Sequence, residues 1–430
     1  MTMTEERSQT TVSPLTLTER RAVGGAVSRS VLSAYFGVAL AGWVAAAATS
    51  IAAASDLAAG RVLAEAPLLA VHLLALGVLP FAVAGGCFHL LPVMLRNDLP
   101  SQRALWLALP LLCGGFPLAV GLASDRDRLL WIGAGLESTG LVIVLAEILK
   151  LVVFAPRGRM LVASRVGVAL SCFHVTAALV LGSLVFDGRL DGASFLRWLL
   201  IHLHVALLGW IALLIVSVGR TLGPMLAVAP VAPPRGWPLE ELTLTAGLWM
   251  ALAGIGLGSR TLMLVGAAGI VLALGRFALL MLRTARLRRA PIEAPLAHLL
   301  AGALLLVQAA AAGIVAAAGV GGTRLVTAYV VLLLVGWAGG VVVGHVGKLL
   351  ALSIWVWWPP GPRPKQAALH SRRLGVAEAA VFALGVEALA LGALLGSAPL
   401  ARAGSVAFCV STVMTAAGAA TTWRRRARPA

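Results

Sequence analysis

Hydrophobic and polar positions follow one another along this chain in long blocks. Apolar runs of helical length are separated by short polar loops. A helix that crosses a hydrocarbon core of ~30 Å at ~1.5 Å per residue needs about 20 apolar residues. The pattern predicts twelve such helices, at residues 31–54, 66–95, 103–124, 128–154, 159–186, 195–229, 241–258, 260–283, 294–319, 323–357, 372–397 and 402–423.

The predicted fold is therefore an all-α polytopic membrane protein with twelve transmembrane helices. These helices form one domain over residues 31–423, and no soluble domain is expected beside it. Residues 1–30 form a polar N-terminal tail and residues 424–430 a basic C-terminal tail. Helices are the expected elements, because irregular backbone that faces lipid leaves peptide groups without hydrogen-bond partners.

Composition changes the picture only by excluding other classes of protein. Hydrophobic residues make up 60% of the chain and charged residues 12%, whereas soluble domains contain ~45–50% and ~25%. The mean hydropathy is +0.95, which leaves too little polar surface for a water-soluble globule. The same numbers exclude disordered and collagen-like chains.

The strong positive charge is explained by membrane topology. The net charge is +17, and 26 of the 34 lysines and arginines fall on the tails and on every second loop. Basic residues mark cytoplasmic loops, so both termini are predicted to be cytoplasmic. The excess of Arg, Ala, Leu, Val and Gly is typical of a GC-rich bacterial genome, which indicates the bacterial inner membrane. No nucleic-acid partner is expected, and membrane lipid is the expected surroundings.

An internal repeat carries several of the histidines. Two predicted helices share the pattern H-x4-G followed by Pro twenty residues after the His: His72, Gly77 and Pro92 in the one, His204, Gly209 and Pro224 in the other. The helix at residues 323–357 keeps Gly336-Trp337 but has Val331 at the His position. The three helices are four apart in chain order, so the pattern predicts three four-helix units, a pseudo-threefold repeat.

The histidines lie at different predicted depths. His72, His202 and His204 lie in the outer part of the membrane, His174 near its middle, and His345 towards the cytoplasm. A neutral imidazole in hydrocarbon needs a hydrogen-bond partner or a metal. Three histidines at similar depth on two repeat-related helices predict a ligand site. His202 and His204 point about 200° apart on a helix, so they serve two sites, one on each side, or one binds while the other fixes a neighbour.

Two further histidines have a simpler interpretation. His298 is interpreted as structural, and His370, in the polar loop before residue 372, as solvated. Four glycines, Gly77, Gly85, Gly86 and Gly209, offer space beside the histidine-bearing helices for a flat macrocycle. Small residues also pack ordinary membrane helices, so this signal is unspecific.

These features resemble subunit I of the heme–copper oxidase superfamily. The resemblance rests on twelve helices, histidines on the second and sixth, their outer placement and the four-helix repeat. The stretches HLHVALLGW (202–210) and GHVGKLLALSIWVWW (344–358) look closer to small bacterial relatives. Those are the NnrS family and the membrane domains fused to copper nitrite reductases or multicopper oxidases in actinobacteria.

The resemblance implies a cofactor and its ligands. It implies one or two b-type hemes, with His72 and His204 as axial ligands, and a second site that uses His202 or His174. It leaves copper and the part of His345 open. The helix at 241–258 lacks the His-His pair of the copper site, and the chain has only two tyrosines, Tyr35 and Tyr329, neither on the sixth helix. Oxygen reduction by the oxidase mechanism is therefore not expected.

Two acids lie inside predicted spans. Glu137 and Glu387 are candidates for a proton path, for a carboxylate beside a ligand, or for pairing with an arginine. Charged residues in spans mark function more often than structure. The acids and bases nearer the cytoplasmic ends are interpreted as ion-paired or snorkelling groups: Glu147, Arg165, Arg220, Arg276, Lys348 and Glu378.

The resulting functional hypothesis is a heme-binding membrane redox protein without a complete oxygen-reducing centre. Its work is electron transfer or redox chemistry linked to nitric oxide or copper, with quinol and an extracytoplasmic copper enzyme or cytochrome as partners. Two alternatives stay open: a twelve-helix secondary transporter, and a non-catalytic membrane subunit of a respiratory complex. The sequence decides neither whether the protein is an enzyme nor its oligomeric state.

Overall fold

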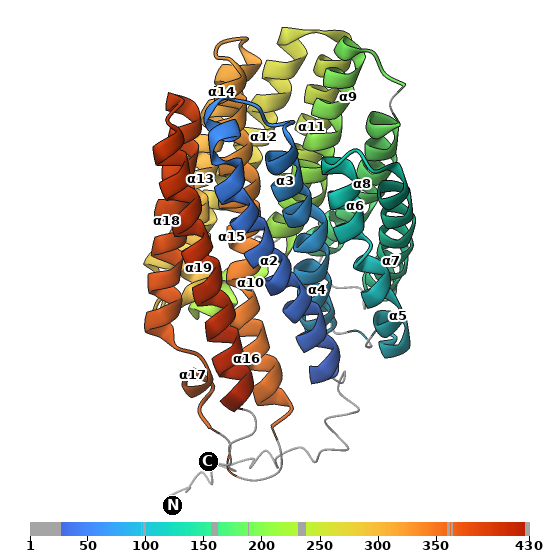
Figure 1. Ribbon diagram of the computed structural model, residues 1–430. Coiled ribbons are helices and arrows are strands. Elements are labelled where there is room, and N and C mark those ends of the chain that lie inside the picture. The colour runs from blue at the N-terminus through green and yellow to red at the C-terminus, as the bar shows by residue number, and fades with distance from the viewer. Residues whose placement is uncertain are drawn as a thin grey trace, which may run out of the picture.

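The computed structural model describes residues 27–95, 97, 100–155, 162–187, 189–230, 238–358, 362 and 364–425. In this part of the chain the regular elements are helices, without a strand (Figure 1). In chain order they are α2 (Arg29–Ala58), α3 (Glu65–Gly77), α4 (Leu79–Leu95), α5 (Gln102–Leu112), α6 (Gly115–Ala123), α7 (Asp127–Val153), α8 (Val162–Phe186), α9 (Gly192–His204), η2 (Val205–Ala212), α10 (Leu213–Ala227), α11 (Leu239–Leu257), α12 (Arg260–Arg286), α13 (Ala294–Ala317), α14 (Thr323–Val330), η3 (Val331–Gly339), α15 (Gly340–Gly344), α16 (Val346–Val356), α17 (Gln366–Leu369), α18 (Arg372–Leu395) and α19 (Ala398–Arg425).

Ten segments in the described residues are long and apolar enough to cross a membrane. Four of them join consecutive helices end to end: Glu65–Leu95, Gln102–Ala123, Gly192–Ala227 and Thr323–Val356. The protein is thus an all-helical, multi-pass membrane protein. Helices are also present at the two remaining predicted spans, as α7 and α11. These two helices carry the buried acids Glu137 and Glu241.

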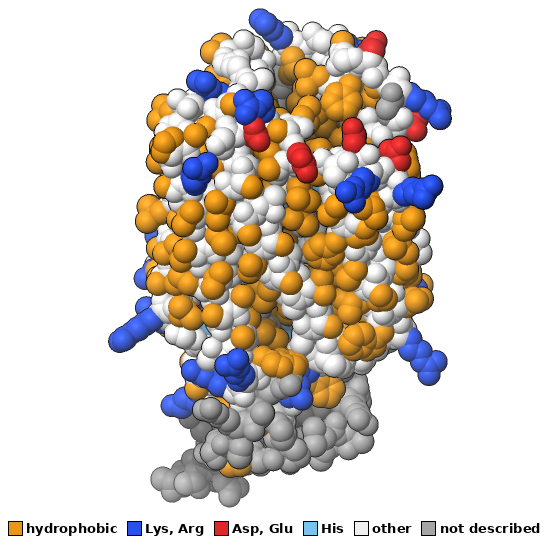
Figure 2. Space-filling model, viewed as in Figure 1, with side chains coloured by type: hydrophobic (Ala, Val, Ile, Leu, Met, Phe, Trp, Pro, Cys, Tyr) orange, Lys and Arg blue, Asp and Glu red, His pale blue; other side chains and the backbone are white. Residues whose placement is uncertain are grey.

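The helices run side by side along the long axis of the molecule (Figure 1). The guanidinium of Arg29, at the start of α2, lies 5.9 Å from the ring centroid of Trp423, near the end of α19. We call the end that carries Arg29 and Trp423 the terminal end, and the other the opposite end. On the face in Figure 2, lysines and arginines gather at both ends and hydrophobic side chains cover the middle. Large apolar side chains such as Ile132, Val142 and Leu272 are exposed, as expected of lipid-facing helices.

Local signals in the sequence begin and end many of the helices. The hydroxyls of Ser28, Ser259 and Ser371 accept hydrogen bonds from backbone amides in the first turns of α2, α12 and α18, which is the usual role of serine before a helix. Gly258 and Gly396 end α11 and α18 with φ of +67° and +72°, a conformation that glycine adopts without strain. The chain can therefore turn back at once into α12 and α19.

Three helix pairs pack through matching glycines. A Cβ atom on Gly133 of α7 would lie 2.6 Å from the carbonyl oxygen of Gly114, at the α5–α6 junction. On Gly266 of α12 it would lie 2.6 Å from the oxygen of Gly247, and on Gly404 of α19 it would lie 2.7 Å from that of Gly385. Any side chain at these positions would push the helices apart, so the glycines fix the close approach of each pair.

Two of the long segments change helical winding in mid-membrane. The segment with α9 and α10 passes through the π-helical turns of η2, and the segment with α14 and α15 through those of η3. Both stretches contain a Gly-Trp pair, Gly209-Trp210 and Gly336-Trp337. π-Helical turns are rare and occur often at functional sites. They therefore draw attention to the side chains that directly precede them.

Candidate functional site

The candidate site is a layer of rings towards the opposite end of the molecule. It contains His72 of α3, Phe186 of α8, His202 and His204 of α9, and Tyr329 of α14. His72 lies in the second turn of α3, which begins at the opposite end after α2 has crossed the molecule (Figure 1). His204 directly precedes η2, and Tyr329 lies two residues before η3. The changes in helical winding thus begin at this layer.

His72 and His202 both contact the ring of Phe186. The centroid of the Phe186 ring is 6.0 Å from that of His72 and 6.5 Å from that of His202, both in edge-on contact. The two imidazoles are close enough to interact electrostatically. The ring of His202 reaches this position by crossing α8 at Gly182, where a Cβ atom would lie 3.1 Å from its Cε1. The structure thus brings His72 together with His202.

His204 faces a different helix. Its ring stacks on Tyr329 with centroids 6.1 Å apart and an angle of 25° between the planes. The hydroxyl of Tyr329 makes a long contact of 3.4 Å with Nε2 of His204. The side chains of His202 and His204 therefore lie on two sides of α9 and contact different neighbours, as their spacing predicts. The Nε2 of His204 is directed to Tyr329 rather than shared with His72.

Five histidines use Nδ1 in the same way. A carbonyl oxygen only accepts hydrogen bonds, so each Nδ1 carries the proton and donates it. The distances from Nδ1 to the accepting oxygen are 2.9 Å for His72 to Leu68, 2.7 Å for His174 to Leu170, 2.9 Å for His202 to Ala178, 2.7 Å for His204 to Leu200 and 2.7 Å for His345 to Val341. This leaves the lone pair of Nε2 available on these rings except that of His204, whose Nε2 contacts the hydroxyl of Tyr329. Metal-binding histidines are commonly oriented in this manner.

His174 is completely buried against the start of the η2 turns. A Cβ atom on Gly209 would lie 2.5 Å from Cδ2 of His174, and the Trp249 ring of α11 lies 5.8 Å away. The Nε2 of His174 is buried and has no hydrogen-bond partner among the described residues. The ring of His174 therefore fits in this position only because residue 209 has no side chain. A hydroxyl or a ligand atom that reached this Nε2 would satisfy a buried polar group.

Rings of the protein itself fill the space beside three of the glycines that were expected to leave room for a macrocycle. Gly77 packs against Phe116 and Gly85 against Phe36, where Cβ atoms would lie 2.8 Å and 2.6 Å from the rings. Gly209 packs against His174 in the same way. Only Gly86 of the four has open space, with Leu349 at 3.8 Å. The expectation that Gly77, Gly85 and Gly209 make room for a porphyrin is therefore wrong.

His345 and His298 lie in a separate polar cluster at the terminal end. The Nε2 of His298 lies 2.8 Å from the carboxylate of Glu378, and both side chains are buried. The ring of His298 covers Gly344, directly before His345. Lys348 and Glu293 form an ion pair of 2.6 Å. His345 is thus distant in the fold from the ring layer, and its predicted part in cofactor binding stays a prediction.

His370 is not a solvated loop residue, contrary to the expectation. Its ring lies against Gly347 and Gly375, where Cβ atoms would come within 3.2 Å of it. Both ring nitrogens are buried and lack hydrogen-bond partners among the described residues. Burial lowers the pKa of His370; Glu293 and Glu378 oppose this shift, while Lys348 and Arg425 add to it.

The two acids inside spans have different surroundings. Glu137 is completely buried beside the break between α5 and α6, and neither carboxyl oxygen has a hydrogen-bond partner among the described residues. Glu387 of α18 accepts a hydrogen bond from the side-chain amide of Gln308 of α13. Among the described residues neither acid is paired with an arginine, so pairing with an arginine is not borne out there, and both stay candidates for a proton path.

Most of the charged groups near the terminal end are paired, as predicted. Arg220 of α10 binds Glu241 of α11 at 2.8 Å, and both side chains are buried. Glu240 bridges Arg220 at 3.3 Å and Arg276 at 3.0 Å. Lys150 pairs with Glu147 at 2.7 Å. Arg165 donates to the carbonyl oxygen of Val152 at 3.0 Å. These contacts stabilise helix packing and do not contribute to the ring layer.

The described residues contain no group of three or more His, Cys, Asp or Glu side chains that is placed to hold a metal ion. Neither the protein-family models nor the curated proteins contain a match to this chain.

Sequence analysis identified the histidines of the layer but missed the rings that accompany them. Phe186 and Tyr329 have no motif around them, and their role depends on which helices pack together. The only available signal was the position of Tyr329 just before Gly336-Trp337, which corresponds to that of His202 before Gly209-Trp210. The pair Arg220–Glu241 was also unforeseen: Arg220 was recognised as a charge within an apolar segment, and Glu241 was not.

Proposed function

We propose that the protein is a b-type heme-binding redox protein of the bacterial inner membrane, in which His72 and His202 are the axial ligands. Heme, when bound, would supply one-electron chemistry. The protein would fix the axial ligands and bury the heme, which together set its potential. Electron transfer between quinol and an extracytoplasmic copper enzyme or cytochrome is the role proposed for this site.

One observation carries the proposal. His72 and His202 come from two helices to contact one ring, that of Phe186, and each uses Nδ1 for a backbone carbonyl, which leaves Nε2 for a metal. The donor chemistry fits a heme, since haem iron is commonly held by imidazole. Phe186 lies at the last residue of α8, where its ring would have to turn away to admit a porphyrin between the histidines.

The proposed architecture is a pseudo-threefold set of four-helix units with twelve transmembrane helices. The contacts between neighbouring helices support this architecture. The α5–α6 junction packs on α7, α11 packs on α12 and α18 packs on α19, each through a close glycine–glycine contact. The first member of each contact also has a second glycine seven residues later: Gly121 after Gly114, Gly254 after Gly247, and Gly392 after Gly385. The units would be α18 and α19 with α2–α4, then α5–α10, then α11–α16. Under this proposal α7 and α11 complete the twelve spans, with both termini in the cytoplasm.

A proton-coupled secondary transporter is the second candidate, and Glu137 is the observation that favours it. This carboxyl is completely buried at a helix break and has no ion-pair partner among the described residues. Interrupted helices with polar groups at their broken ends form the binding sites of many transporters. A transporter needs no heme, so the content of heme distinguishes the two candidates.

The test begins with the protein purified in detergent from cells supplied with a heme precursor. We expect sharp low-spin bands in the reduced-minus-oxidised spectrum and about one b-type heme per chain in a pyridine hemochrome assay. His72→Ala and His202→Ala should each abolish the low-spin bands. A colourless preparation that does not take up added hemin contradicts the proposal and makes the transporter the function to test.

A further inference from the structure

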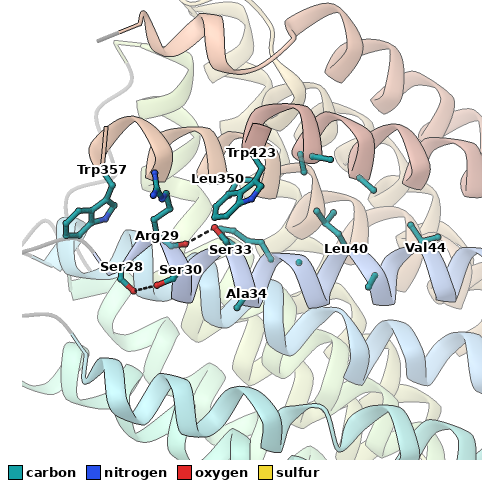
Figure 3. Close-up of a pocket in the computed structure, with 16 residues that line it drawn as sticks. Ser28, Arg29, Ser30, Ser33, Ala34, Leu40, Val44, Leu350, Trp357 and Trp423 are labelled. Carbon is teal, nitrogen blue, oxygen red and sulfur yellow. Dashed lines mark hydrogen bonds between the residues drawn. The ribbon is translucent and has the colours of Figure 1, made fainter. Parts of the chain in front are cut away.

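A long groove runs along the lipid-facing side of the terminal end, between α2, α16 and α19. Its volume is about 1160 Å³, above the ~300–1,000 Å³ typical of sites for drug-sized ligands. Most of the wall is apolar, and the polar residues gather at one end of the groove (Figure 3). The groove lies on helices that contain none of the histidines of the ring layer.

The polar end of the groove presents a cation and hydroxyl groups. Arg29 is half-buried there, and its guanidinium lies over the ring of Trp423 at 5.9 Å. No carboxylate among the described residues forms a salt bridge with Arg29. Ser28 and Ser30 form a hydrogen-bonded pair beside it, 3.2 Å apart. A half-buried guanidinium without an anion, next to hydroxyl donors, is complementary to a phosphate group.

Two tryptophans place this end at the membrane–water interface. Trp357 and Trp423 line the groove near Arg29 (Figure 3), and tryptophan rings are enriched at the level of lipid headgroups. The indole N–H of Trp357 donates to the carbonyl oxygen of Val27 at 3.0 Å. That hydrogen bond fixes its ring at the mouth of the groove.

The apolar part of the groove has the depth of one membrane leaflet. It extends along α2 from Ser33 past Gly37 and Leu40 to Val44. The eleven steps from Ser33 to Val44 cover about 16 Å at 1.5 Å per residue, close to half of a hydrocarbon core of about 30 Å. A Cβ atom on Gly37 would meet nothing within 4 Å, so the groove is open at this point. An acyl chain of the same leaflet fits these dimensions.

We infer that this groove binds one anionic phospholipid of the leaflet at the terminal end. Its phosphate lies at Arg29 and the serine pair, and one acyl chain lies along α2 towards Val44. The charge of Arg29, which no carboxylate of the described residues pairs, favours this occupant over a quinone, whose head group is neutral. The inference does not depend on the proposed heme function, because no residue of the groove belongs to the ring layer.

Native mass spectrometry of the full chain in detergent tests the inference. The purified protein is titrated with dioleoyl phosphatidylglycerol and, separately, with dioleoyl phosphatidylcholine, which has the same acyl chains. A basic residue near an anionic lipid contributes about 1 kcal/mol, so the first-bound phosphatidylglycerol should have about a fivefold lower Kd. Arg29→Gln should abolish this preference and leave the binding of phosphatidylcholine unchanged.

Two further variants separate the groove from the general positive charge of this end. Gly37→Leu places a side chain in the groove without a clash and should weaken the binding of both lipids. Arg286→Gln removes an exposed cation at the end of α12, outside the groove, and should keep the fivefold preference.

The inference is overturned if wild-type protein binds the two lipids equally, or if Arg286→Gln loses the preference as fully as Arg29→Gln does. It is also overturned if menaquinone displaces phosphatidylglycerol from the wild type at equal concentration. In that case the groove is a quinone site. Retention of both lipids by Gly37→Leu with wild-type Kd would place the lipid elsewhere on the protein.

Discussion

The ring of His204 lies nearly parallel to the ring of Tyr329, at 25°, with centroids 6.1 Å apart and the tyrosine hydroxyl 3.4 Å from Nε2. This contact joins α9 to α14 directly before the two stretches of π-helical turns. It also occupies the nitrogen of His204 that a metal would need. The two histidines of the H-L-H motif therefore have different surroundings: His204 has a ring partner, and His202 has an Nε2 that no described residue hydrogen-bonds.

This difference predicts distinct spectra for two neighbouring substitutions. His202→Ala should abolish the low-spin heme bands, whereas His204→Ala should retain them, because only His202 lies beside His72. Reduced-minus-oxidised spectra of both variants, normalised to protein by amino-acid analysis, make the comparison. Loss of the bands in His204→Ala together with their retention in His202→Ala would reverse the assignment of the axial ligand.

Gly209 should tolerate no side chain, because His174 covers it. A Cβ atom would lie 2.5 Å from Cδ2 of that ring, and overpacking of a filled core costs about 1–3 kcal/mol. Gly209→Ala should therefore lower the midpoint of thermal unfolding in detergent. Gly275→Ala in α12 is the matched control, since its Cβ would meet nothing within 4 Å. Equal midpoints for the two variants would argue against the packing of His174 on Gly209.

Hydrophobic pattern was sufficient to predict the helices of this protein. The predicted span at 372–397 is α18 (Arg372–Leu395), and the one at 294–319 is α13 (Ala294–Ala317). Long apolar runs leave the backbone no other way to satisfy its hydrogen bonds in lipid. Loop residues such as Gly396 and Ser371 then fix the ends. The interruptions of the long segments were not predicted, because tertiary packing determines where the winding changes.

The composition of the candidate site was predictable only in part. The spacing of His202 and His204 predicted that their side chains point away from each other, since residues two apart point to opposite sides of a helix. Which ring each one meets depends on the neighbours of α9, and the sequence does not specify these. The sequence placed His174 and Gly209 in the membrane as separate features, and the structure packs one on the other. The glycine pattern Gly114, Gly247 and Gly385 was present in the sequence but was not recognised.

The pair Arg220–Glu241 should be the most costly charge interaction to disrupt. Both side chains are buried and lie 2.8 Å apart, so removing one partner leaves an uncompensated charge and costs about 3–5 kcal/mol. Glu241→Gln should therefore lower the unfolding midpoint strongly, although Glu240 retains a contact of 3.3 Å with Arg220. Arg276→Gln removes an exposed cation from the same network and should cost less than about 1 kcal/mol. A smaller effect for Glu241→Gln than for Arg276→Gln would show that Arg220 is solvated.

His370 should make the terminal end sensitive to acid. Burial lowers its pKa from the ordinary value of 6.5, so the folded protein favours the neutral ring and the unfolded chain binds the proton more readily. Stability from this group is then present above pH 6.5 and decreases as the pH falls below that value. Unfolding midpoints in detergent at pH 7.5 and 5.5 should differ more for the wild type than for His370→Gln, which has no proton to bind. His298 and Glu378 remain intact in both proteins, so they cancel from the comparison. An identical pH dependence in the two proteins would show that His370 is accessible to water, contrary to its burial between Gly347 and Gly375.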